Sequence, residues 1–451
     1  MKILKTIHQF LPRHVAGSEV HTYYLCKELL KRHDVLLLHP DHFDDRPSLS
    51  IRETVYDGIP VMTFKYPYGS VNFEKTYRNP EFDALFSSLL DSYQPDLLHI
   101  QHLFYLTPRI ILLARERGIP VVMTLHEYGS QCAASGLRMR SDFKLCESID
   151  PRLCAGCLID SPHVFRGGQA RGRLEKFWSK ASRTVRRPFE IAGLDHSLPQ
   201  DPALREVLDR ESEMRETHAG VDLFIAPSKY LYDKFLEWGI PKEKLLHLNY
   251  GFEREPLLAV RKEPSAKVRF AYIGSVMPHK GVDLLVEAFN GLPHDAAELK
   301  IYGEPSFQPG FYQKLRQNAR HPGITFEGFL PVDKVGEAYQ RIDALVVPSR
   351  WFENSPLTMQ EAFLCGAAVI ASDLGGMKEL VTPGVNGLLF ETGNVQDLRR
   401  AMLEFLSNPL FFEPEKIRRS VPLKNLPEYT AEMEAHYERL VAECKTAKSV
   451  S

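Results

Sequence analysis

Two glutamates, Glu353 and Glu361, stand eight positions apart in the run SRWFENSPLTMQEAFLCG. The same run carries residue types that start helices. Asn354 and Ser355 are good N-cap types, and Pro356 suits the first helical position because it has no N–H to leave unpaired. The run therefore predicts a helix that begins close to Ser355, with one glutamate just before it and the other inside it.

Apolar runs at 344–347 and 368–371 flank this predicted helix. Two such runs joined by a helix indicate a parallel βαβ unit, so the helix opens at the carboxyl edge of a sheet. Ligands of open α/β sheets bind at this edge, and the free N–H groups of a helix start suit a diphosphate. That anion would repel Glu353, which is expected instead to accept hydrogen bonds from a neutral polyol, while Glu361 can reach a second set of hydroxyls. A phosphate flanked by two hydroxyl-bearing rings describes a nucleotide sugar; the alternative is two surface glutamates at a chance spacing.

The composition is that of an ordinary globular protein. The chain has 451 residues, which predicts two or three domains, and its net charge of −2 argues against nucleic acid as the main partner. Its first apolar run is too short for a secretory signal, and no run is long enough to span a bilayer. Seven cysteines in so long a chain do not indicate a secreted disulfide framework. We therefore expect a cytoplasmic protein.

Strand-like runs alternate with helix-like periods along most of the chain, which predicts doubly wound parallel sheets. The alternation lapses over about 129–217, which we interpret as an insertion. A polar linker then separates two α/β domains of Rossmann-like type, predicted at 1–252 and 268–425. The remaining segment, 426–451, has apolar residues at helical spacing and is expected to cover a groove on the first domain.

Four motifs of the second domain occur in a characteristic order: FAYIGSVMPHKGVDLLVEA, VVPS, ENSPLTMQE and SDLGGMKELV. Together they resemble the retaining glycosyltransferases of family 4, which have two facing Rossmann-like domains in the GT-B arrangement. In the first domain the resemblance is thinner. Ala16 and Gly17 resemble the family's glycine loop before the first helix, and 124–127 resembles its Thr-x-His-acid turn. The resemblance implies an N-terminal acceptor-side domain and a C-terminal domain that binds a nucleotide sugar.

Carried onto this sequence, the resemblance implies a role for each motif residue. Glu353 would contact hydroxyls of the donor sugar, Glu361 the ribose, and Lys280 the diphosphate, where its charge would stabilise the leaving nucleotide. Phe329 and Leu330 fall where the family holds the base through backbone groups. The backbone that would bind the diphosphate belongs to Asn354, Ser355, Pro356 and Leu357.

One position departs from the family pattern. Family members often carry an arginine after the glycine that Gly274 matches, and this chain has Ser275 there. Neutralisation of the phosphates would then rest on Lys280, with help from His279 or from an arginine elsewhere such as Arg350. No Asp-x-Asp pair occurs, so no catalytic divalent metal is expected.

In the first domain, His126 matches the family histidine that points toward the transferred sugar, and Gly17 would let the backbone approach the donor. His102, which follows a predicted strand, is a weaker candidate. A lone histidine at a strand end is more often packed and hydrogen-bonded than catalytic. A Ser/His/Asp hydrolase is disfavoured because no serine lies in a strand-turn-helix elbow.

The predicted insertion begins with four cysteines, of which the last two form a Cys-x-x-Cys pair. Four thiols suit tetrahedral zinc, and zinc could hold together a loop with little core. Unligated thiols and a redox pair are the alternatives. The predicted ligands are Cys132, Cys146, Cys154 and Cys157.

A basic segment with interleaved aromatic residues follows at 165–189. It could lie on an anionic membrane, which would place the protein peripherally on the inner face, or hold an anionic acceptor. A solvated basic helix is the equally favoured alternative.

The combined prediction is a retaining glycosyltransferase that moves a sugar from a UDP- or GDP-sugar to a hydroxyl of a glycan or lipid-linked acceptor, in cell-surface polysaccharide or glycolipid synthesis. The expected route is same-face attack, with a diphosphate oxygen taking the acceptor proton. Two alternatives stay open. One is a nucleotide-sugar epimerase on a GT-B scaffold, which would need an acid and a base facing C2 of the donor. The other is a catalytically silent protein that binds sugar nucleotides, against which the intact Glu353, Glu361, Lys280 and His126 weigh.

Overall fold

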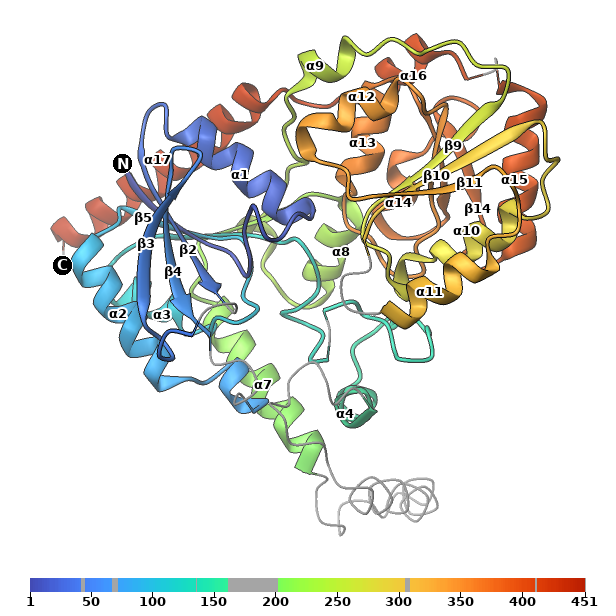
Figure 1. The fold of residues 1–451 in the computed structure, drawn as a ribbon. Coiled ribbons are helices and arrows are strands. Elements are labelled where there is room, and N and C mark those ends of the chain that lie inside the picture. The colour runs from blue at the N-terminus through green and yellow to red at the C-terminus, as the bar shows by residue number, and fades with distance from the viewer. Residues whose placement is uncertain are drawn as a thin grey trace. The chain divides into compact units, whose positions relative to one another are not determined.

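The protein is described here by a computed structural model that covers most of the chain. The described residues are 1–41, 45–66, 72–134, 136–160, 202–304, 309–409 and 412–450. Contacts between Cα atoms divide the chain into two compact units, and the described strands form two sheets (Figure 1). The first unit comprises Met1–Phe10, Leu29–Phe224 and Tyr437–Ser451, and the second comprises Leu11–Glu28 and Ile225–His436. The predicted class, two α/β domains with parallel sheets, is confirmed; the boundaries 1–252, 268–425 and 426–451 stay predictions.

The first sheet has eight strands in the order β3-β4-β2-β1-β5-β6-β7-β8. The pairs β1 with β2, β1 with β5, β2 with β4 and β5 with β6 are parallel, and only the edge pair β3 with β4 is antiparallel among the pairs whose register is given for the described residues. The strands span β1 Lys2–Thr6, β2 Asp34–Asp41, β3 Ile51–Tyr56, β4 Ile59–Lys65, β5 Leu97–Ile100, β6 Val121–Thr124, β7 Leu223–Ala226 and β8 Leu245–His247.

The helices before residue 250 and the C-terminal helix follow local sequence signals. In α2 (Pro80–Tyr93), the Asn79 side chain caps the first turn by accepting from the Phe82 backbone N–H, and proline occupies the first helical position. The last helix, α17 (Leu426–Val450), buries Tyr429, Met433 and Tyr437, as the helical spacing predicted. The other helices are α1 Gly17–Leu29, η1 Glu74–Thr76, α3 Ile110–Glu116, α4 Pro151–Asp160, α7 Pro202–His218, α8 Lys229–Glu237 and η3 Lys242–Lys244.

The second sheet has six strands in the order β11-β10-β9-β12-β13-β14, and all its pairs are parallel. Helices cover both of its faces (Figure 1). The strands span β9 Val268–Ile273, β10 Ala297–Tyr302, β11 Ile324–Gly328, β12 Ala344–Val347, β13 Ala368–Ser372 and β14 Gly387–Phe390. The helices are α9 Arg254–Leu258, η4 Pro278–Lys280, α10 Val282–Phe289, α11 Pro309–Asn318, η5 Val332–Lys334, α12 Val335–Tyr339, α13 Leu357–Leu364, α14 Gly375–Leu380, α15 Val395–Ser407 and α16 Pro414–Ser420.

The helix predicted between the two apolar runs is α13, and it lies between the parallel neighbours β12 and β13 as expected. Its start differs from the prediction. Helical residues begin at Leu357, Pro356 is the N-cap in an extended conformation, and no side chain caps the helix. The side chains of Asn354 and Ser355 have other partners, described below. At the other end, Gly366 has φ +68, the left-handed geometry of a helix stop.

Candidate functional site

Glu353 receives three hydrogen bonds on one carboxylate oxygen. Its Oε1 accepts from Ser349 Oγ at 2.6 Å, from Lys280 Nζ at 2.7 Å and from Trp351 Nε1 at 2.8 Å. Burial alone would raise the pKa of this carboxyl, but the Lys280 ammonium and the three donors outweigh burial and hold the pKa below its usual range. Glu353 is therefore an anion throughout the neutral pH range.

Lys280 is presented by a tight turn that needs a glycine. Gly281, which follows η4, has φ +71, and a Cβ there would lie 1.9 Å from the Pro348 backbone oxygen. The turn places the Lys280 ammonium 5.0 Å from the centre of the Trp351 ring as well as against Glu353. An ammonium carries three N–H donors, and the described hydrogen bonds use one of them. Contact of Lys280 with a diphosphate stays a prediction.

The two residues suggested as helpers of Lys280 do not offer a free charge. The Arg350 guanidinium binds both carboxylate oxygens of Asp283 at 2.7 Å and the Pro278 carbonyl at 2.8 Å. Arg350 therefore fixes the 278–283 turn. Burial, together with the Lys280 charge, lowers the pKa of His279 to about 4, so its ring is neutral at pH 7. The suggestion that either supplies a positive charge to the phosphates is not supported by this geometry.

The residues before α13 are held by a closed ring of amide and hydroxyl groups. Ser355 Oγ donates to Asn249 Oδ1, Asn249 Nδ2 donates to Gln360 Oε1, and Gln360 Nε2 donates to Ser355 Oγ, each at 2.8 Å. Asn354 Oδ1 accepts from Ser228 at 2.6 Å. The side chains that the sequence suggested as caps therefore fix the loop, and the first N–H groups of α13 have no side-chain cap in the described structure. Asn249, Gln360 and Ser228 were not predicted, because their partners are remote in sequence.

A glycine lets the next helix pack directly on this loop. The Gly376 N–H in α14 donates to the Glu353 carbonyl at 2.9 Å, and a Cβ on Gly376 would lie 1.5 Å from the Asn354 carbonyl oxygen. The sequence motif SDLGGMKELV thus has a packing function: any side chain at Gly376 would displace the segment that carries Glu353.

Glu361, inside α13, has the opposite electrostatic environment from Glu353. Burial raises the pKa of Glu361 to about 7, and no cation lowers it. Two carboxylates of one short segment thus differ in charge near neutral pH. Both lie in the second unit, which is where the sequence placed the donor site.

The predicted base-binding residues and the glycine loop follow two strands of the second sheet, β11 and β9, which are separated by β10. Gly274 follows β9, and Phe329 and Leu330 follow β11, on the same carboxyl edge. The Ser275 carbonyl accepts from the Tyr272 hydroxyl at 2.7 Å, and the Phe329 side chain is 48% exposed. Gly17 lies at the start of α1, where a Cβ would meet the Leu357 side chain at an ordinary 3.6 Å. No contact with the described residues therefore requires a glycine at this position, and its role toward a donor stays a prediction.

In the first unit, His126 belongs to a buried polar chain. Its Nε2 lies 2.9 Å from Gln101 Oε1, and Gln101 Nε2 lies 2.9 Å from His99 Nε2. The His99 ring reaches the Tyr437 hydroxyl at 2.6 Å and the Lys5 ammonium at 2.9 Å through its Nδ1. Sequence reasoning missed Gln101, His99 and Tyr437; the signal available was the run HIQH after a predicted strand.

The other histidine candidate, His102, lies against an acidic residue that was not predicted as a site residue. His102 Nε2 is 3.5 Å from Glu127 Oε1. Burial, with a contribution from His126, lowers the pKa of His102 to about 3, and burial raises the pKa of Glu127 to about 8. Both side chains are therefore uncharged at pH 7, which argues against a strong ion pair.

The four cysteines of the predicted zinc site form no disulfide within the described residues. Burial, with contributions from Cys132, Cys157 and Cys146, raises the pKa of Cys154 to about 12, so the thiols lie near one another. However, no group of three or more His, Cys, Asp or Glu side chains within the described residues is arranged to hold a metal ion. The predicted zinc site is therefore not confirmed, and elemental analysis of the purified protein would decide it.

Buried arginines hold the cysteine-containing loop by hydrogen bonds. Arg138 donates to Gln131 Oε1 at 2.8 Å and to the Cys146 carbonyl at 3.0 Å, and Arg210 donates to the Gly129 carbonyl. These contacts order the loop, and zinc at its cysteines stays a prediction. The basic segment 165–189, and with it the predicted membrane contact, lies outside the described residues.

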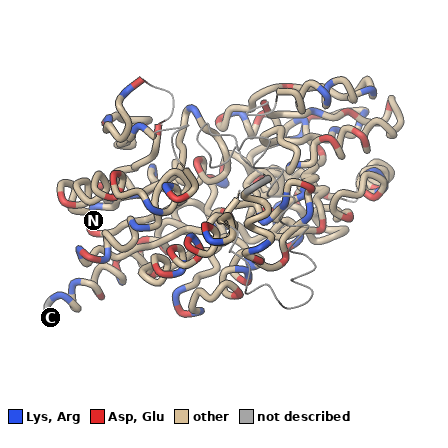
Figure 2. The backbone as a smooth tube through the Cα atoms, turned by 90° about the horizontal axis from the view of Figure 1, so that it is seen from below, with Lys and Arg blue, Asp and Glu red and all other residues tan. Residues whose placement is uncertain are grey.

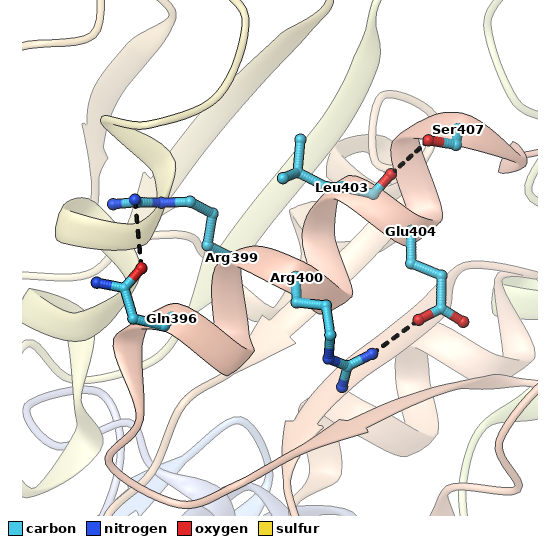
Figure 3. Close-up of a pocket in the computed structure, with 6 residues that line it drawn as sticks. All are labelled: Gln396, Arg399, Arg400, Leu403, Glu404 and Ser407. Carbon is cyan, nitrogen blue, oxygen red and sulfur yellow. Dashed lines mark hydrogen bonds and ion pairs between the residues drawn. The ribbon is translucent and has the colours of Figure 1, made fainter.

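Over the described residues, neither the surface charge nor a pocket on α15 indicates another site. Basic and acidic residues are interspersed over the described backbone (Figure 2). A pocket on α15 is lined by six residues of that helix alone, and Arg400 within it pairs with Glu404 at 2.9 Å (Figure 3). This pocket is the outer face of one helix and contains none of the predicted site residues. Among the described residues, no helix is both long enough and apolar enough to cross a membrane.

In fold, this chain is a GT-B protein. The Anabaena protein HepE, solved in complex with UDP and glucose, aligns over 97% of this chain and 100% of its own with a TM-score of 0.63 and 16% identity. Two family models, "Glycosyl transferases group 1" at residues 253–421 and "Glycosyltransferase Family 4" at residues 15–150, together match more than half of the chain. The chain therefore belongs to the group 1 glycosyltransferases.

Curated relatives are similar over parts of the chain. An uncharacterised glycosyltransferase of Methanocaldococcus jannaschii is 32% identical over 142 residues, which is 30% of this chain and 38% of the relative. The GDP-mannose-dependent alpha-mannosyltransferase of Mycobacterium tuberculosis is 28% identical over 231 residues, 50% of this chain and 58% of the relative. The chain thus spans roughly two fifths to three fifths of the length of these relatives.

Proposed function

We propose that this protein transfers a sugar, with retention, from a nucleotide diphosphate donor to a hydroxyl of a glycan or lipid-linked acceptor. The observation that carries the proposal is the Glu353 carboxylate, fixed by three donors beside the uncapped start of α13. A helix start with free N–H groups suits a diphosphate, and a permanent carboxylate suits sugar hydroxyls. Family membership supports a nucleotide sugar as the donor.

In this proposal the two ends of the donor meet different groups. The N–H groups at the start of α13 and the Lys280 ammonium hold the diphosphate and stabilise the charge that develops on it as the glycosidic bond breaks. Glu353 holds the donor sugar, and Glu361 holds the ribose. The acceptor hydroxyl attacks the same face of the sugar and passes its proton to the departing diphosphate oxygen, so no protein nucleophile is required.

The names of related proteins support a class of donor and of pathway. HepE was solved with UDP, and the mycobacterial relative is named for GDP-mannose. Other relatives are named for amylovoran biosynthesis and for lipopolysaccharide N-acetylglucosamine transfer. These names support a UDP- or GDP-sugar and a cell-surface polysaccharide or glycolipid product. Membrane contact of 165–189 and a cytoplasmic location stay predictions from the sequence.

A donor screen tests the proposal. Purified protein is incubated with a panel of UDP- and GDP-sugars, and nucleotide release and thermal stabilisation are recorded for each. We expect one base to stabilise the protein and at least one of its sugars to be hydrolysed slowly without acceptor. Glu353→Ala should abolish this hydrolysis while nucleotide stabilisation persists. The proposal would be contradicted if no nucleotide sugar in the panel stabilised the protein.

A further inference from the structure

The hydrogen bonds on Glu353 fall on one oxygen only. Oε1 accepts from Ser349, Lys280 and Trp351, which saturates the lone pairs of an sp² oxygen. Within the described part of the chain, Oε2 accepts no hydrogen bond. This oxygen is also not fully buried. Oε2 therefore retains contact with solvent and can accept a hydrogen bond from a ligand.

An ion pair with Lys280 would not by itself produce this asymmetry. A carboxylate bound only to an ammonium can rotate about its last bond and exchange its two oxygens at little cost. Ser349 and Trp351 are neutral donors from the same loop, four and two positions before Glu353, and their side chains are buried, at 0% and 8% exposure. Because their directions are fixed by packing, they select one orientation of the carboxylate plane.

We propose that Ser349 and Trp351 are positioning residues that orient Glu353 so that Oε2 alone meets a hydroxyl of the donor sugar. This inference rests on the proposed function and adds to it the residues that set recognition of the sugar. Ser349 and Trp351 touch no reacting atom, and they act through Glu353.

The proposal makes a specific prediction for the amide variant. In Glu353→Gln, the amide oxygen must occupy the Oε1 position, because three donors point there, and the NH₂ group must then occupy the Oε2 position. The group that meets the sugar changes from an acceptor to a donor, although size and packing are conserved. We expect at least a hundredfold loss of turnover with the affinity for the bare nucleotide unchanged.

Two conservative variants remove the positioning hydrogen bonds, and the same unit offers a matched control for each. Ser349→Ala is compared with Ser372→Ala, because the Ser372 hydroxyl is also fully buried but makes no hydrogen bond. Trp351→Phe, which keeps an aromatic ring beside Lys280, is compared with Trp238→Phe, because both tryptophans are 8% exposed. Ser349→Ala and Trp351→Phe should each lower kcat by on the order of tenfold, which is a change of about 1.4 kcal/mol. The two controls should match wild type.

The test measures kcat, KM for the donor, nucleotide affinity and the midpoint of thermal unfolding for each variant. A fall in kcat with nucleotide affinity and stability near those of the matched control supports the proposal. Equal kcat in each variant and its control would overturn it. If Trp351→Phe does not fold, Ser349→Ala decides alone.

Donor analogues that lack one sugar hydroxyl separate this inference from the proposed function. Wild type should lose turnover with the analogue that lacks the recognised hydroxyl, whereas Glu353→Gln, already impaired, should lose little more. Additive losses at every hydroxyl would overturn the inference while leaving transferase activity intact. If wild type turned over no nucleotide sugar, both the proposed function and this inference would be overturned.

Discussion

The carboxyl edges of the two sheets treat their ionisable side chains in opposite ways. At the edge of the second sheet, Lys280 and Glu353 form an ion pair at 2.7 Å, and the pKa of Glu353 is held below its usual range. At the edge of the first sheet, burial raises the pKa of Glu127 to about 8 and lowers that of His102 to about 3. Glu353 therefore keeps its charge at neutral pH beside Lys280, whereas Glu127 and His102 are neutral there.

The difference follows from what accompanies burial. Burial disfavours the charged form of any group, but a nearby opposite charge and hydrogen bonds from donors can outweigh it. Glu353 has both, whereas Glu127 has a backbone N–H and a more remote Arg210. Fixed charges suit a charged ligand such as a diphosphate donor, and neutral polar groups suit an uncharged hydroxyl. The two edges thus match the two kinds of substrate in the proposed reaction.

The largest expected effect is the loss of donor turnover when Lys280 is removed. Lys280→Ala is expected to lower turnover by about a hundredfold or more, because it deletes a preorganised charge at the developing diphosphate and the partner of Glu353. Lys334→Ala, which removes an exposed lysine paired with Glu337 at 2.6 Å, is the control and should match wild type. The measurement is steady-state turnover of the donor.

The same variant sharpens the expectation that catalysis needs no divalent ion. Wild-type turnover should survive chelation of magnesium and manganese, because Lys280 and the start of α13 supply the positive potential. If activity vanished in chelator and returned with magnesium, while Lys280→Ala stayed near wild type, a metal site would be neutralising the diphosphate instead.

A second prediction separates the two glutamates of the charged edge. At about pH 8, where a carboxyl with a pKa of about 7 is mostly ionised, Glu361→Ala should weaken binding of the bare nucleotide by about 1.5–3 kcal/mol, the contribution of a hydrogen bond to a charged group, because the proposal assigns Glu361 to the ribose. Glu353→Ala should leave nucleotide affinity nearly unchanged while turnover collapses. Isothermal calorimetry with UDP and GDP measures both affinities, and equal losses in the two variants would contradict the division.

The sequence predicted the order of elements around α13 but not the contacts that fix them. The βαβ unit, the position of Glu353 before the helix and the stop at Gly366 all follow from local residue types. The helix start was placed too early, because Asn354 and Ser355 looked like caps. Their side chains bind Ser228 and Asn249, which lie 126 and 106 positions away, and a single sequence carries no sign of such pairs.

The first unit shows the limit of sequence reasoning more clearly. His126 was predicted as a site residue from its motif, and that role stays a prediction. Its contact with Gln101 joins residues 25 positions apart, and the raised pKa of Glu127 results from burial, so neither could be read from the motif. For the cysteines, the spacing suggested zinc, which stays a prediction, and the structure adds hydrogen bonds from Arg138 that order the loop. Cysteine spacing carried no sign of these arginine contacts.

The smallest expected effect is the contribution of Glu127 to the pH dependence of folding stability. The folded-state pKa of Glu127 is about 8, above its ordinary value of 4.5, so folding favours the protonated form. The stability that this group contributes is fully present below about pH 4.5 and is lost as pH rises through 8. Wild type should therefore lose stability between pH 5 and pH 9, and Glu127→Gln, which cannot ionise, should lose less. The difference at pH 9 should be at least about 1 kcal/mol, or about 2 °C or more in the midpoint of thermal unfolding. Glu413→Gln, at an exposed residue, is the control for the substitution itself. The midpoint of thermal unfolding is measured for the variant and for wild type at several pH values. Parallel curves of midpoint against pH would show that Glu127 is ionised in the folded protein at neutral pH. That result would remove the contrast between the two edges.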